Sequence, residues 1–313
     1  MPVLPADLDF SRCPACKSGP LEAVAGDRLR CASCGHDFGC QDGIPILVDD
    51  WQRHEAELDR ARTSLPGWYE EEQAAETESP WRHHLARRRS FVQESLRAFA
   101  SKAGGKAGRL LDLGCGDGNH LTWLKDHAER LYGSDYNLLR LLRSDRRKTG
   151  ATLFLADIMS YPSHDNFFDV IYFNHVLEHI PDDARALETV TRILKPGGLL
   201  VLGVPNEGAW WWQLAYRRAP VVRANTDHVN FYTGKTLARK VEQSGLLVTQ
   251  VKPIGWGPPD WNLDMRMRRY KFWDDTFEWF GKRLLPSQSV ALYVLAVKPL
   301  EGRSPNVEAA KVI

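Results

Sequence analysis

The sequence predicts an α/β protein with a doubly wound, mostly parallel sheet, preceded by a small metal-binding ribbon. Three observations support this. A short apolar run ends in glycines at alternate positions within residues 109–120. Beyond it, segments with strand pattern alternate with segments with helix pattern, which is typical of a parallel sheet covered by helices. Before it, the chain has two C-x2-C pairs.

Composition sets the size and the broad class. The chain has 313 residues, 43% of them apolar, enough for one large domain or for one medium and one small domain. Its 41 Lys and Arg nearly balance its 40 Asp and Glu, so bulk charge predicts no nucleic-acid partner. We see neither a secretory leader pattern nor an apolar run that could span a bilayer. We therefore expect a cytoplasmic protein without a transmembrane segment.

Residues 1–50 have the cysteine spacing of a zinc ribbon. Cys13 and Cys16 are followed, after fourteen residues, by Cys31 and Cys34. Four thiolates match the tetrahedral coordination of Zn²⁺ in a closed structural site, so no open position is left for catalysis. The predicted Zn²⁺ would fold a segment that is too short to build its own core. Cys40 is surplus to this count.

The run CGHDFGCQDGIPILV, which begins at Cys34, the last of the four predicted ligands, resembles the zinc ribbon of Trm112-like proteins. It also resembles the ribbon that precedes the bacterial 23S rRNA guanine-N1 methyltransferases. The resemblance applies to the four cysteines only, and it implies a ribbon attached to a methyltransferase.

Residues 51–105 are interpreted as a helical connector. Residues 51–80 are polar and acidic, and Trp68 and Tyr69 either contact the substrate side or dock the linker. Residues 81–100 place apolar side chains at helical spacing, with arginines at 87–89 on the other face. Those arginines either bind phosphates or form a solvated helix face.

The glycine loop predicts a nucleotide-type ligand. Leu110, Leu111 and Leu113 form an apolar strand that ends at the G-x-G-x-G of residues 114–118, with Asn119 as the expected N-cap of a helix through residue 130. A dinucleotide fingerprint is G-x-G-x-x-G, and here asparagine replaces the last glycine, which weakens that interpretation.

An acidic residue before G-x-G-x-G resembles motif I of the class I S-adenosylmethionine (SAM) dependent methyltransferases, of the type 11/12-like group. The resemblance implies a Rossmann-like seven-stranded sheet over residues 106–299, a tail at 300–313, and SAM as the cofactor. The loop at 112–118 would then hold the methionine part of SAM.

Two further acids end the next strands. Asp135 lies twenty-one residues beyond Gly114, the spacing at which a carboxylate accepts the ribose hydroxyls. The other interpretation is a helix cap, and one residue can serve both purposes. The resemblance implies that Asp157 reaches the adenine amino group and that Ile158 lies against the ring.

The stretch at 168–181 contains His175, Glu178 and His179 in an H-x-x-E-H pattern. That pattern also occurs on metalloprotease helices. Here the stretch straddles a strand end and is followed at once by Pro181, so a shared helix face is not expected. It resembles motif IV of the methyltransferases instead, which implies that the backbone at Asn174 receives the amino group of SAM. The K-P-G-G at 195–198 before the fifth strand strengthens the resemblance.

The predicted site residues divide into cofactor-binding and catalytic groups. The predicted cofactor-binding residues are Asp112, Gly114, Cys115, Gly116, Gly118, Asp135, Tyr136, Asp157, Ile158 and Asn174. The candidate catalytic residues are His228 and His175. His228 lies in D-H-V-N-F, which resembles a histidine-bearing segment of many small-molecule methyltransferases, where it would remove a proton from the acceptor. A structural histidine is the alternative.

Two insertions, at 207–230 and 256–286, combine tryptophans with arginines. In this type of fold they would form a lid above the carboxyl ends of the strands. Their aromatics could stack on bases, contact a membrane surface, or form an ordinary hydrophobic cap. The expected reaction is methyl transfer to a hydroxyl or amine of a small molecule or glycolipid. An RNA base is the second acceptor considered, and a non-catalytic SAM-binding scaffold is the alternative of another class.

Overall fold

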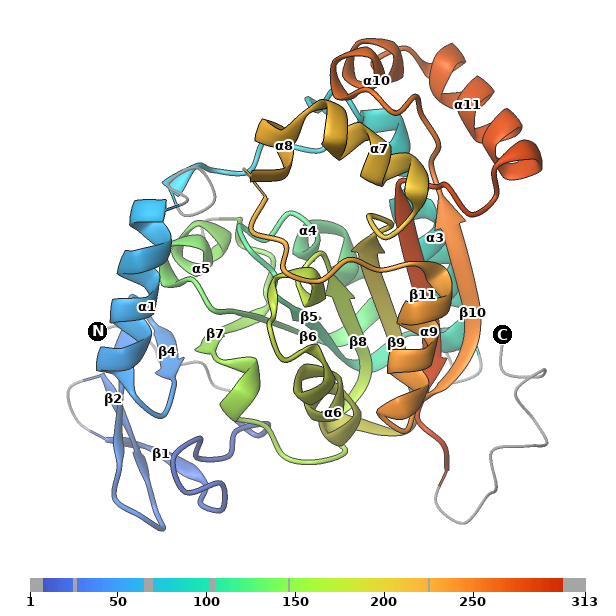
Figure 1. Cartoon of the computed structure of the whole chain (residues 1–313). Coiled ribbons are helices and arrows are strands. Elements are labelled where there is room, and N and C mark those ends of the chain that lie inside the picture. The colour runs from blue at the N-terminus through green and yellow to red at the C-terminus, as the bar shows by residue number, and fades with distance from the viewer. Residues whose placement is uncertain are drawn as a thin grey trace. The chain divides into compact units, whose positions relative to one another are not determined.

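The computed structural model describes residues 8–24, 27–64, 70–101, 105–145, 147–224 and 226–300 (Figure 1). Trp68, Tyr69 and nearly all of the expected tail lie outside these residues. The chain divides into two compact units. The first unit comprises Met1–Gln73, Ala107–Ile171 and Arg192–Lys195. The second unit comprises Ala74–Lys106, Tyr172–Thr191 and Pro196–Ile313.

The ribbon of the first unit is an antiparallel meander of four short strands. They are β1 (Leu21–Val24), β2 (Arg28–Cys31), β3 (Asp37–Gln41) and β4 (Ile44–Leu47). The hairpin between β1 and β2 lies between the two cysteine pairs and presents them to each other. The ribbon therefore places its four cysteines at one end of the meander.

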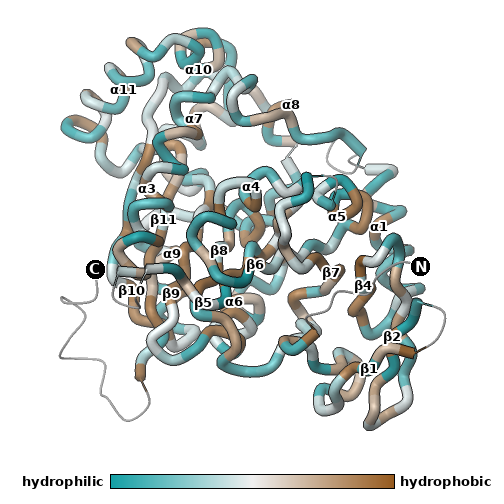
Figure 2. The backbone as a smooth tube through the Cα atoms, turned by 180° about the vertical axis from the view of Figure 1, so that it is seen from behind, coloured by the Kyte–Doolittle hydropathy of each residue, from teal (hydrophilic) through white to brown (hydrophobic). Residues whose placement is uncertain are grey.

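The ribbon continues into the main sheet of the first unit. That sheet contains β5 (Ala107–Leu113), β6 (Ala128–Asp135) and β7 (Thr152–Ala156), paired in parallel. β4 adds to β7 in parallel, with Ile46 opposite Leu155, so the strand order in this unit is β1-β2-β3-β4-β7-β6-β5 (Figure 1). Both β4 and β7 are hydrophobic in Figure 2, as expected of strands covered on two faces.

The N-terminal segment is fixed to this sheet by one buried ring and one carboxylate. Phe10 is fully buried, with its ring centroid 4.3 Å from that of Phe154. Asp9 forms ion pairs with Arg109 on β5 and Arg130 on β6, at 3.1 and 3.0 Å. The segment that leads into the first cysteine pair is therefore part of the packed unit.

The helices of the first unit are shorter than the sequence predicts. They are α1 (Trp51–Ser64), α4 (Leu121–Leu124) and α5 (Leu138–Asp145), with 3-10 turns at Lys125–His127 and Ile158–Ser160. The expected helix through residue 130 is wrong, and so is its cap, because the N-cap of α4 is His120. The reason is tertiary: Ala128 pairs with Ala107, and Arg130 pairs with Arg109. These ladder hydrogen bonds outweigh weak helix propensity.

Strand β8 (Phe168–Asn174) begins in the first unit and ends in the second. β9 (Leu194–Pro205), which lies in the second unit from Pro196 on, β11 (Ala291–Val297) and β10 (Leu247–Ile254) pair antiparallel in that order. β11 is buried along its whole length. With β5 to β8, these strands supply the seven predicted strands of the Rossmann-like methyltransferase fold.

Helices in the second unit surround these strands. They are α3 (Arg82–Ser101), α6 (Asp183–Ile193), α7 (Trp210–Arg218), α8 (Pro220–Ala224), α9 (Gly234–Gln243), α10 (Trp261–Arg268) and α11 (Lys271–Leu284). The two predicted insertions thus carry α7 and α8, and α10 and α11. Among the helices that the structure describes, none combines the length and apolarity needed to cross a bilayer.

The arginines of α3 do not form the solvated face that was one interpretation of the sequence. Arg87 pairs with Asp274 and, at 3.0 Å, with Asp275 on α11. Arg88 donates to Tyr293 Oη at 3.0 Å. These arginines attach α3 to neighbouring elements of its own unit.

Candidate functional site

The glycine loop after β5 has the backbone that its sequence requires. Gly114, Gly116 and Gly118 have φ values of 79°, 54° and 76°, in the left-handed region that favours glycine. A Cβ on Gly118 would lie 2.3 Å from Ser144 Oγ, so a larger residue does not fit there. The backbone N–H groups of Gly114 and Cys115 both donate to the carbonyl of Ser134 on β6. The loop is therefore held by the neighbouring strand.

Asp135 lies at the glycine loop, as the sequence spacing predicts. Its Oδ2 accepts a hydrogen bond from the Gly116 N–H at 2.8 Å, and its Oδ1 accepts one from Asn137 at 2.8 Å. The side chain of Asn137 accepts from Leu139 and so caps the start of α5. The cap is thus provided by Asn137, and Asp135 is directed towards the loop.

Asp112 is a buried carboxylate with few interactions that could stabilise its negative charge. The residue is 1% exposed, and its Oδ2 has no hydrogen-bond partner among the described residues. The imidazole of His120 lies nearby, with its Nδ1 4.0 Å from Oδ2. Burial, with the charge of Asp135 as a second cause, raises the pKa of Asp112 well above its ordinary value. Such an acid at a ligand loop suits a cationic group that arrives with the ligand.

The remaining predicted cofactor residues of the first unit lie on two neighbouring strand ends. Asp157 Oδ1 accepts from Met159 N at 2.9 Å, and burial raises the pKa of this carboxyl. Ile158 follows it, half-buried. The Tyr136 hydroxyl donates to Glu57 of α1, a contact that the sequence did not predict.

A second buried acid of the loop was missed by the sequence reasoning. Asp117 is fully buried, and its Oδ2 accepts from the Gln73 N–H at 2.6 Å. Arg143 Nη1 lies 3.7 Å from its Oδ1. A Cβ on Gly116 would lie 3.5 Å from Gln73 Oε1, so Gln73 lies against the glycine loop. No local sequence pattern predicts these contacts of Gln73, which only the folded structure shows.

The second unit contains a histidine and carboxylate cluster beyond the end of β8. His175 has a φ of 54°, uncommon for a residue with a Cβ and often found at functional sites. Its Nδ1 lies 3.0 Å from Oε1 of Glu178, whose side chain is 1% exposed. The backbone carbonyl of Glu178 accepts from the N–H groups of Val229 and Asn230, at 2.9 and 3.1 Å. These bonds hold residue 228 beside residue 178.

Two histidines of this cluster are each oriented by a carboxylate. His228 Nδ1 lies 2.7 Å from Glu207 Oε2, and His179 Nδ1 lies 2.7 Å from Asp227 Oδ1. The His179 and His228 ring centroids are 4.7 Å apart. Burial lowers the pKa of His228, but the hydrogen bond and charge of Glu207 outweigh it, and the pKa is raised. The predicted proximity of His228 and His175 to a catalytic centre stays a prediction.

Asn174 ends β8 with its side chain already engaged. Its Oδ1 accepts from Tyr293 Oη at 2.8 Å and from Arg88 Nη2 at 3.3 Å. Tyr293 comes from β11 and Arg88 from α3, neither of which the sequence connects to Asn174. The expected role of the Asn174 backbone in binding SAM stays a prediction.

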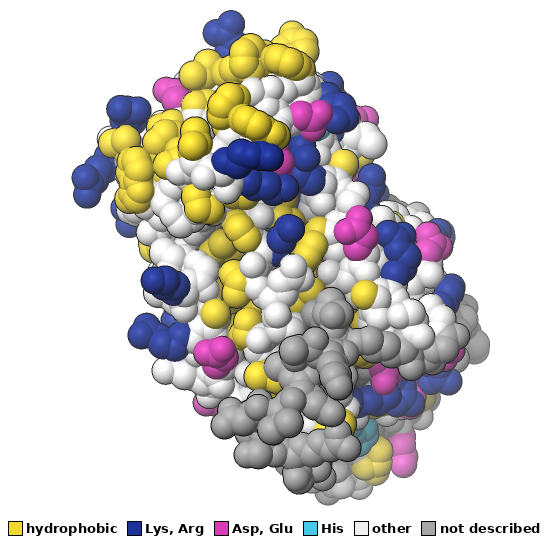
Figure 3. Space-filling view, turned by 90° about the vertical axis from the view of Figure 1, so that its right-hand side faces the viewer, with side chains coloured by type: hydrophobic (Ala, Val, Ile, Leu, Met, Phe, Trp, Pro, Cys, Tyr) yellow, Lys and Arg dark blue, Asp and Glu magenta, His cyan; other side chains and the backbone are white. Residues whose placement is uncertain are grey.

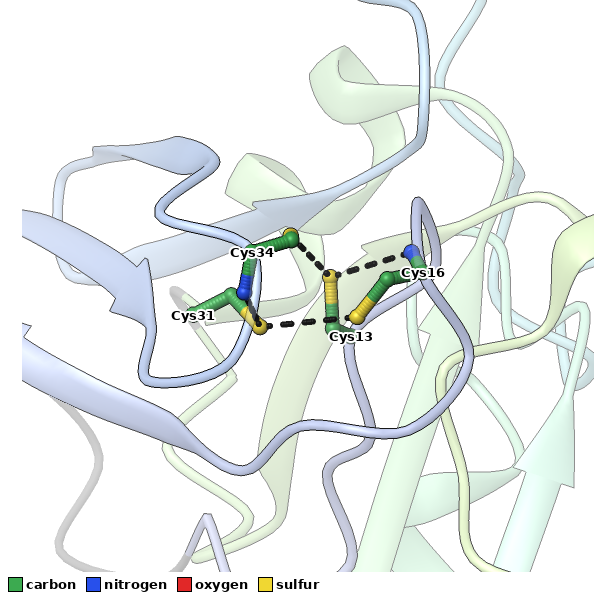
Figure 4. Close-up of side chains that lie close together, drawn as sticks. All are labelled: Cys13, Cys16, Cys31 and Cys34. Carbon is green, nitrogen blue, oxygen red and sulfur yellow. Dashed lines mark hydrogen bonds between the residues drawn. The ribbon is translucent and has the colours of Figure 1, made fainter.

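The four ribbon cysteines gather in one cluster (Figure 4). Cys13 Sγ lies 3.8 Å from Cys34 Sγ, and Cys16 Sγ lies 3.6 Å from Cys31 Sγ. A tetrahedral ion with four sulfur ligands at about 2.3 Å would separate the sulfurs by about 3.8 Å. Backbone N–H groups of Cys16 and Cys34 point at the Sγ atoms of Cys13 and Cys31. The cluster has the donor set and the spacing of a tetrahedral metal site.

Comparison with known proteins identifies the family. Residues 81–251 match the family described as "Methyltransferase domain". The chain belongs to the class I SAM-dependent methyltransferase family. This match begins beyond the ribbon, so the cysteine cluster is an addition to the family's domain.

Individual relatives of this methyltransferase match about half of the chain. A Streptomyces fradiae protein, "Uncharacterized 37.1 kDa protein in transposon TN4556", is 34% identical over 53% of this chain and 50% of its own length. A "Ubiquinone biosynthesis O-methyltransferase" of Methylococcus capsulatus is 29% identical over 55% of this chain and 73% of its own. Thus the match spans only half of the first relative. Among solved structures, N-methyltransferase NodS from Bradyrhizobium japonicum, with S-adenosyl-L-homocysteine, is 19% identical with a TM-score of 0.49, over 80% of this chain and 98% of its own.

Proposed function

We propose that this protein transfers the methyl group of SAM to a hydroxyl or amine of a small molecule or glycolipid. The observation that carries the proposal is Asp112, a buried carboxylate at the glycine loop whose Oδ2 has no hydrogen-bond partner among the described residues. The loop at 112–118 would hold the methionine part of SAM, whose ammonium group would supply a donor and a positive charge. Asp135 would accept the ribose hydroxyls, and Asp157 would accept from the adenine amino group.

Methyl transfer from SAM depends more on the positioning of the two reactants than on covalent catalysis by the protein. The acceptor oxygen or nitrogen attacks the methyl carbon, while the breaking carbon–sulfur bond returns its electron pair to the sulfonium. The products are the methylated acceptor, S-adenosylhomocysteine and one proton, which leaves the acceptor. The protein holds donor and acceptor in line and excludes water.

A small-molecule acceptor is supported by the names of relatives. One is the ubiquinone biosynthesis O-methyltransferase above, and another is a "Trans-aconitate 2-methyltransferase" of Variovorax paradoxus, 31% identical over 32% of this chain and 40% of its own length. Incubation of the pure protein with labelled SAM and fractionated extract tests this. Label in small metabolites or lipid supports the proposal, whereas label in RNA assigns the reaction to a base. Tight SAM binding without any methyl transfer would indicate a scaffold.

A lipid-borne acceptor is supported by helix α11, whose apolar side chains face outward. Phe272 and Leu284 are 70% exposed, and Trp279 is 52% exposed. Asp274 and Glu278 lie on the opposite face, buried, and Arg87 pairs with Asp274. Figure 3 shows hydrophobic and cationic side chains together on the surface at the top of the view. Exposed aromatics with cations beside them suit the interface of an anionic membrane.

We therefore expect the protein to bind anionic vesicles through α11. Trp279→Ala and Phe272→Ala together should reduce sedimentation with phosphatidylglycerol vesicles by at least about fivefold, because each ring contributes on the order of 1–2 kcal/mol on burial. Trp210→Ala, which removes an equally exposed tryptophan from α7, serves as the matched control. If wild type and double variant sediment alike, α11 is not a membrane contact.

His228→Ala should lower turnover while leaving SAM affinity nearly unchanged. The ring lies in the second unit, whereas the predicted SAM-binding acids Asp112, Asp135 and Asp157 lie in the first. A positioned imidazole typically contributes 10²–10⁴-fold to such reactions, so a loss of at least about tenfold is expected. Steady-state turnover and calorimetric SAM titration are the measurements. Unchanged turnover would remove His228 from the reaction.

We also propose that the cysteine cluster binds one structural Zn²⁺. All four donors are sulfur, so the ion would be coordinatively closed and would stabilise the ribbon rather than take part in methyl transfer.

A further inference from the structure

We propose that Glu178, His179 and His228 form a binding site for a divalent first-row cation, separate from the cysteine cluster. One ligand atom from each of the three lies within 4.8 Å of the others. Two imidazoles and one carboxylate are the donor set of catalytic zinc sites and of other transition-metal sites with open positions. The motif at 175–179 supplies two of these residues, and His228 comes from a separate loop.

The cluster has the supporting contacts that metal sites use. His228 Nδ1 shares a hydrogen bond with Glu207 Oε2 at 2.7 Å, and His179 Nδ1 lies at ion-pair distance, 2.7 Å, from Asp227 Oδ1. A histidine whose Nδ1–H donates to a carboxylate keeps Nε2 unprotonated and fixes its ring, which is the usual arrangement behind a metal-binding imidazole. The contact of His228 with Glu207 has this arrangement, and a second carboxylate lies beside His179.

Glu178 supplies the third, anionic donor. Its side chain is 1% exposed, and neither carboxylate oxygen has a hydrogen-bond partner within the described part of the chain. A carboxylate in the interior without such partners is destabilising unless a cation or a donor reaches it. His175 Nδ1 lies 3.0 Å from Oε1, at ion-pair distance.

The site is both rigid and accessible. The two N–H donors of residues 229 and 230 to the Glu178 carbonyl, and Asn230 Nδ2 donating to the Ile180 carbonyl at 2.7 Å, join the two loops that carry the ligands. The side chains of His179 and His228 keep 24% and 14% of their surface exposed. An ion can therefore enter from solvent and find its ligands already positioned.

Three protein ligands leave coordination positions open for an oxygen atom of a bound molecule, and with the ion bound His228 would act on that molecule through the ion and not as a base. The suggestion that this cation binds a hydroxyl or carboxylate of the acceptor rests on the proposed function. The cation site itself does not rest on it, because a bound cation is detected without SAM or acceptor.

The test is a Mn²⁺ titration of the full chain loaded with one equivalent of Zn²⁺, which the cysteine cluster takes up, followed by the electron paramagnetic resonance signal of free Mn²⁺. Mn²⁺ prefers oxygen and nitrogen donors, so the cysteine cluster does not take it up. We expect one Mn²⁺ per wild-type chain, and binding at least tenfold weaker in His179→Gln and in His228→Gln. His83→Gln, which removes a histidine of the same unit outside the cluster, should bind as wild type does.

Two further measurements keep the proposal falsifiable if a ligand variant folds poorly. Total Zn²⁺ after dialysis should be two per wild-type chain, and Asp227→Asn and Glu207→Gln should weaken Mn²⁺ binding about 10- to 100-fold, the range seen when such supporting groups are removed. Wild-type chain that binds no Mn²⁺ and holds a single Zn²⁺ overturns the site and leaves a hydrogen-bonded histidine cluster. Metal binding without SAM binding would instead refute the proposed function alone.

Discussion

Asp112→Asn is expected to weaken SAM binding by about 30-fold or more and, at the same time, to stabilise the SAM-free protein. The affinity loss follows because the neutral amide cannot pair with the ammonium group of SAM, and a hydrogen bond between charged partners contributes about 2 kcal/mol. The gain in stability follows because the buried carboxylate has one oxygen without a partner.

The pH dependence of the free energy of unfolding gives a second test with the same Asp112→Asn variant. Burial raises the pKa of Asp112 in the folded protein above its unfolded value. The folded state therefore binds more protons, and the free energy of unfolding falls as pH rises from about 4 towards the raised pKa. The wild-type protein therefore carries more of this penalty at pH 7 than at pH 5, and the asparagine variant carries none of it.

The measurements are calorimetric SAM titration and thermal unfolding at pH 5 and pH 7. We expect Asp112→Asn to raise the unfolding temperature at pH 7 by about 2 °C or more, with a smaller difference at pH 5. Asp126→Asn, an exposed acid of the same unit, is the matched control and should change neither quantity. A variant that binds SAM as tightly as wild type would refute the role of Asp112.

Cys31→Ser is expected to release the Zn²⁺ of the ribbon and to destabilise the first unit as a whole. Structural Zn²⁺ binding contributes about 10–16 kcal/mol in small zinc peptides, comparable with the entire stability of a domain. Loss of the ribbon also removes β4 from the edge of β7, so that the backbone at Leu155 and Ala156 loses its partner strand. An unpaired hydrophobic edge promotes aggregation.

Zinc content, unfolding temperature and limited proteolysis report on this prediction. We expect one Zn²⁺ fewer per chain, an unfolding temperature lower by several degrees, and cleavage within the ribbon. Cys40→Ser is the matched control, because Cys40 lies on β3 outside the cluster. Equal effects of the two substitutions, or a Cys31→Ser protein that keeps its zinc, would argue against a structural zinc site.

Local sequence patterns predicted the structure correctly wherever it depends on residues that are close together in the chain. Glycines at 114, 116 and 118 predicted a loop with left-handed backbone, and all three adopt it. The spacing of two C-x2-C pairs predicted that four sulfurs converge, and they do. Strand periodicity predicted the strands of the sheet, and Asp135 was placed at the loop from its distance along the chain.

Long-range pairing decided what the patterns could not. The sequence predicted that Glu129 and Arg130 end a helix. They instead belong to β6, because this strand pairs with β5 through backbone hydrogen bonds. Gln73 and Glu57 show no motif, and only the folded chain brings them to the glycine loop and to Tyr136.

The sequence by itself therefore determined the class of fold, the glycine loop, the acids at the strand ends and the convergence of four cysteines. Each of these depends on spacings within a short stretch of the chain. Only the tertiary structure decided that β4 extends the main sheet, that Asp112 Oδ2 has no hydrogen-bond partner among the described residues, and that Glu178, His179 and His228 meet. Those features depend on contacts between segments far apart in the chain, whose free energy is not encoded in any local pattern.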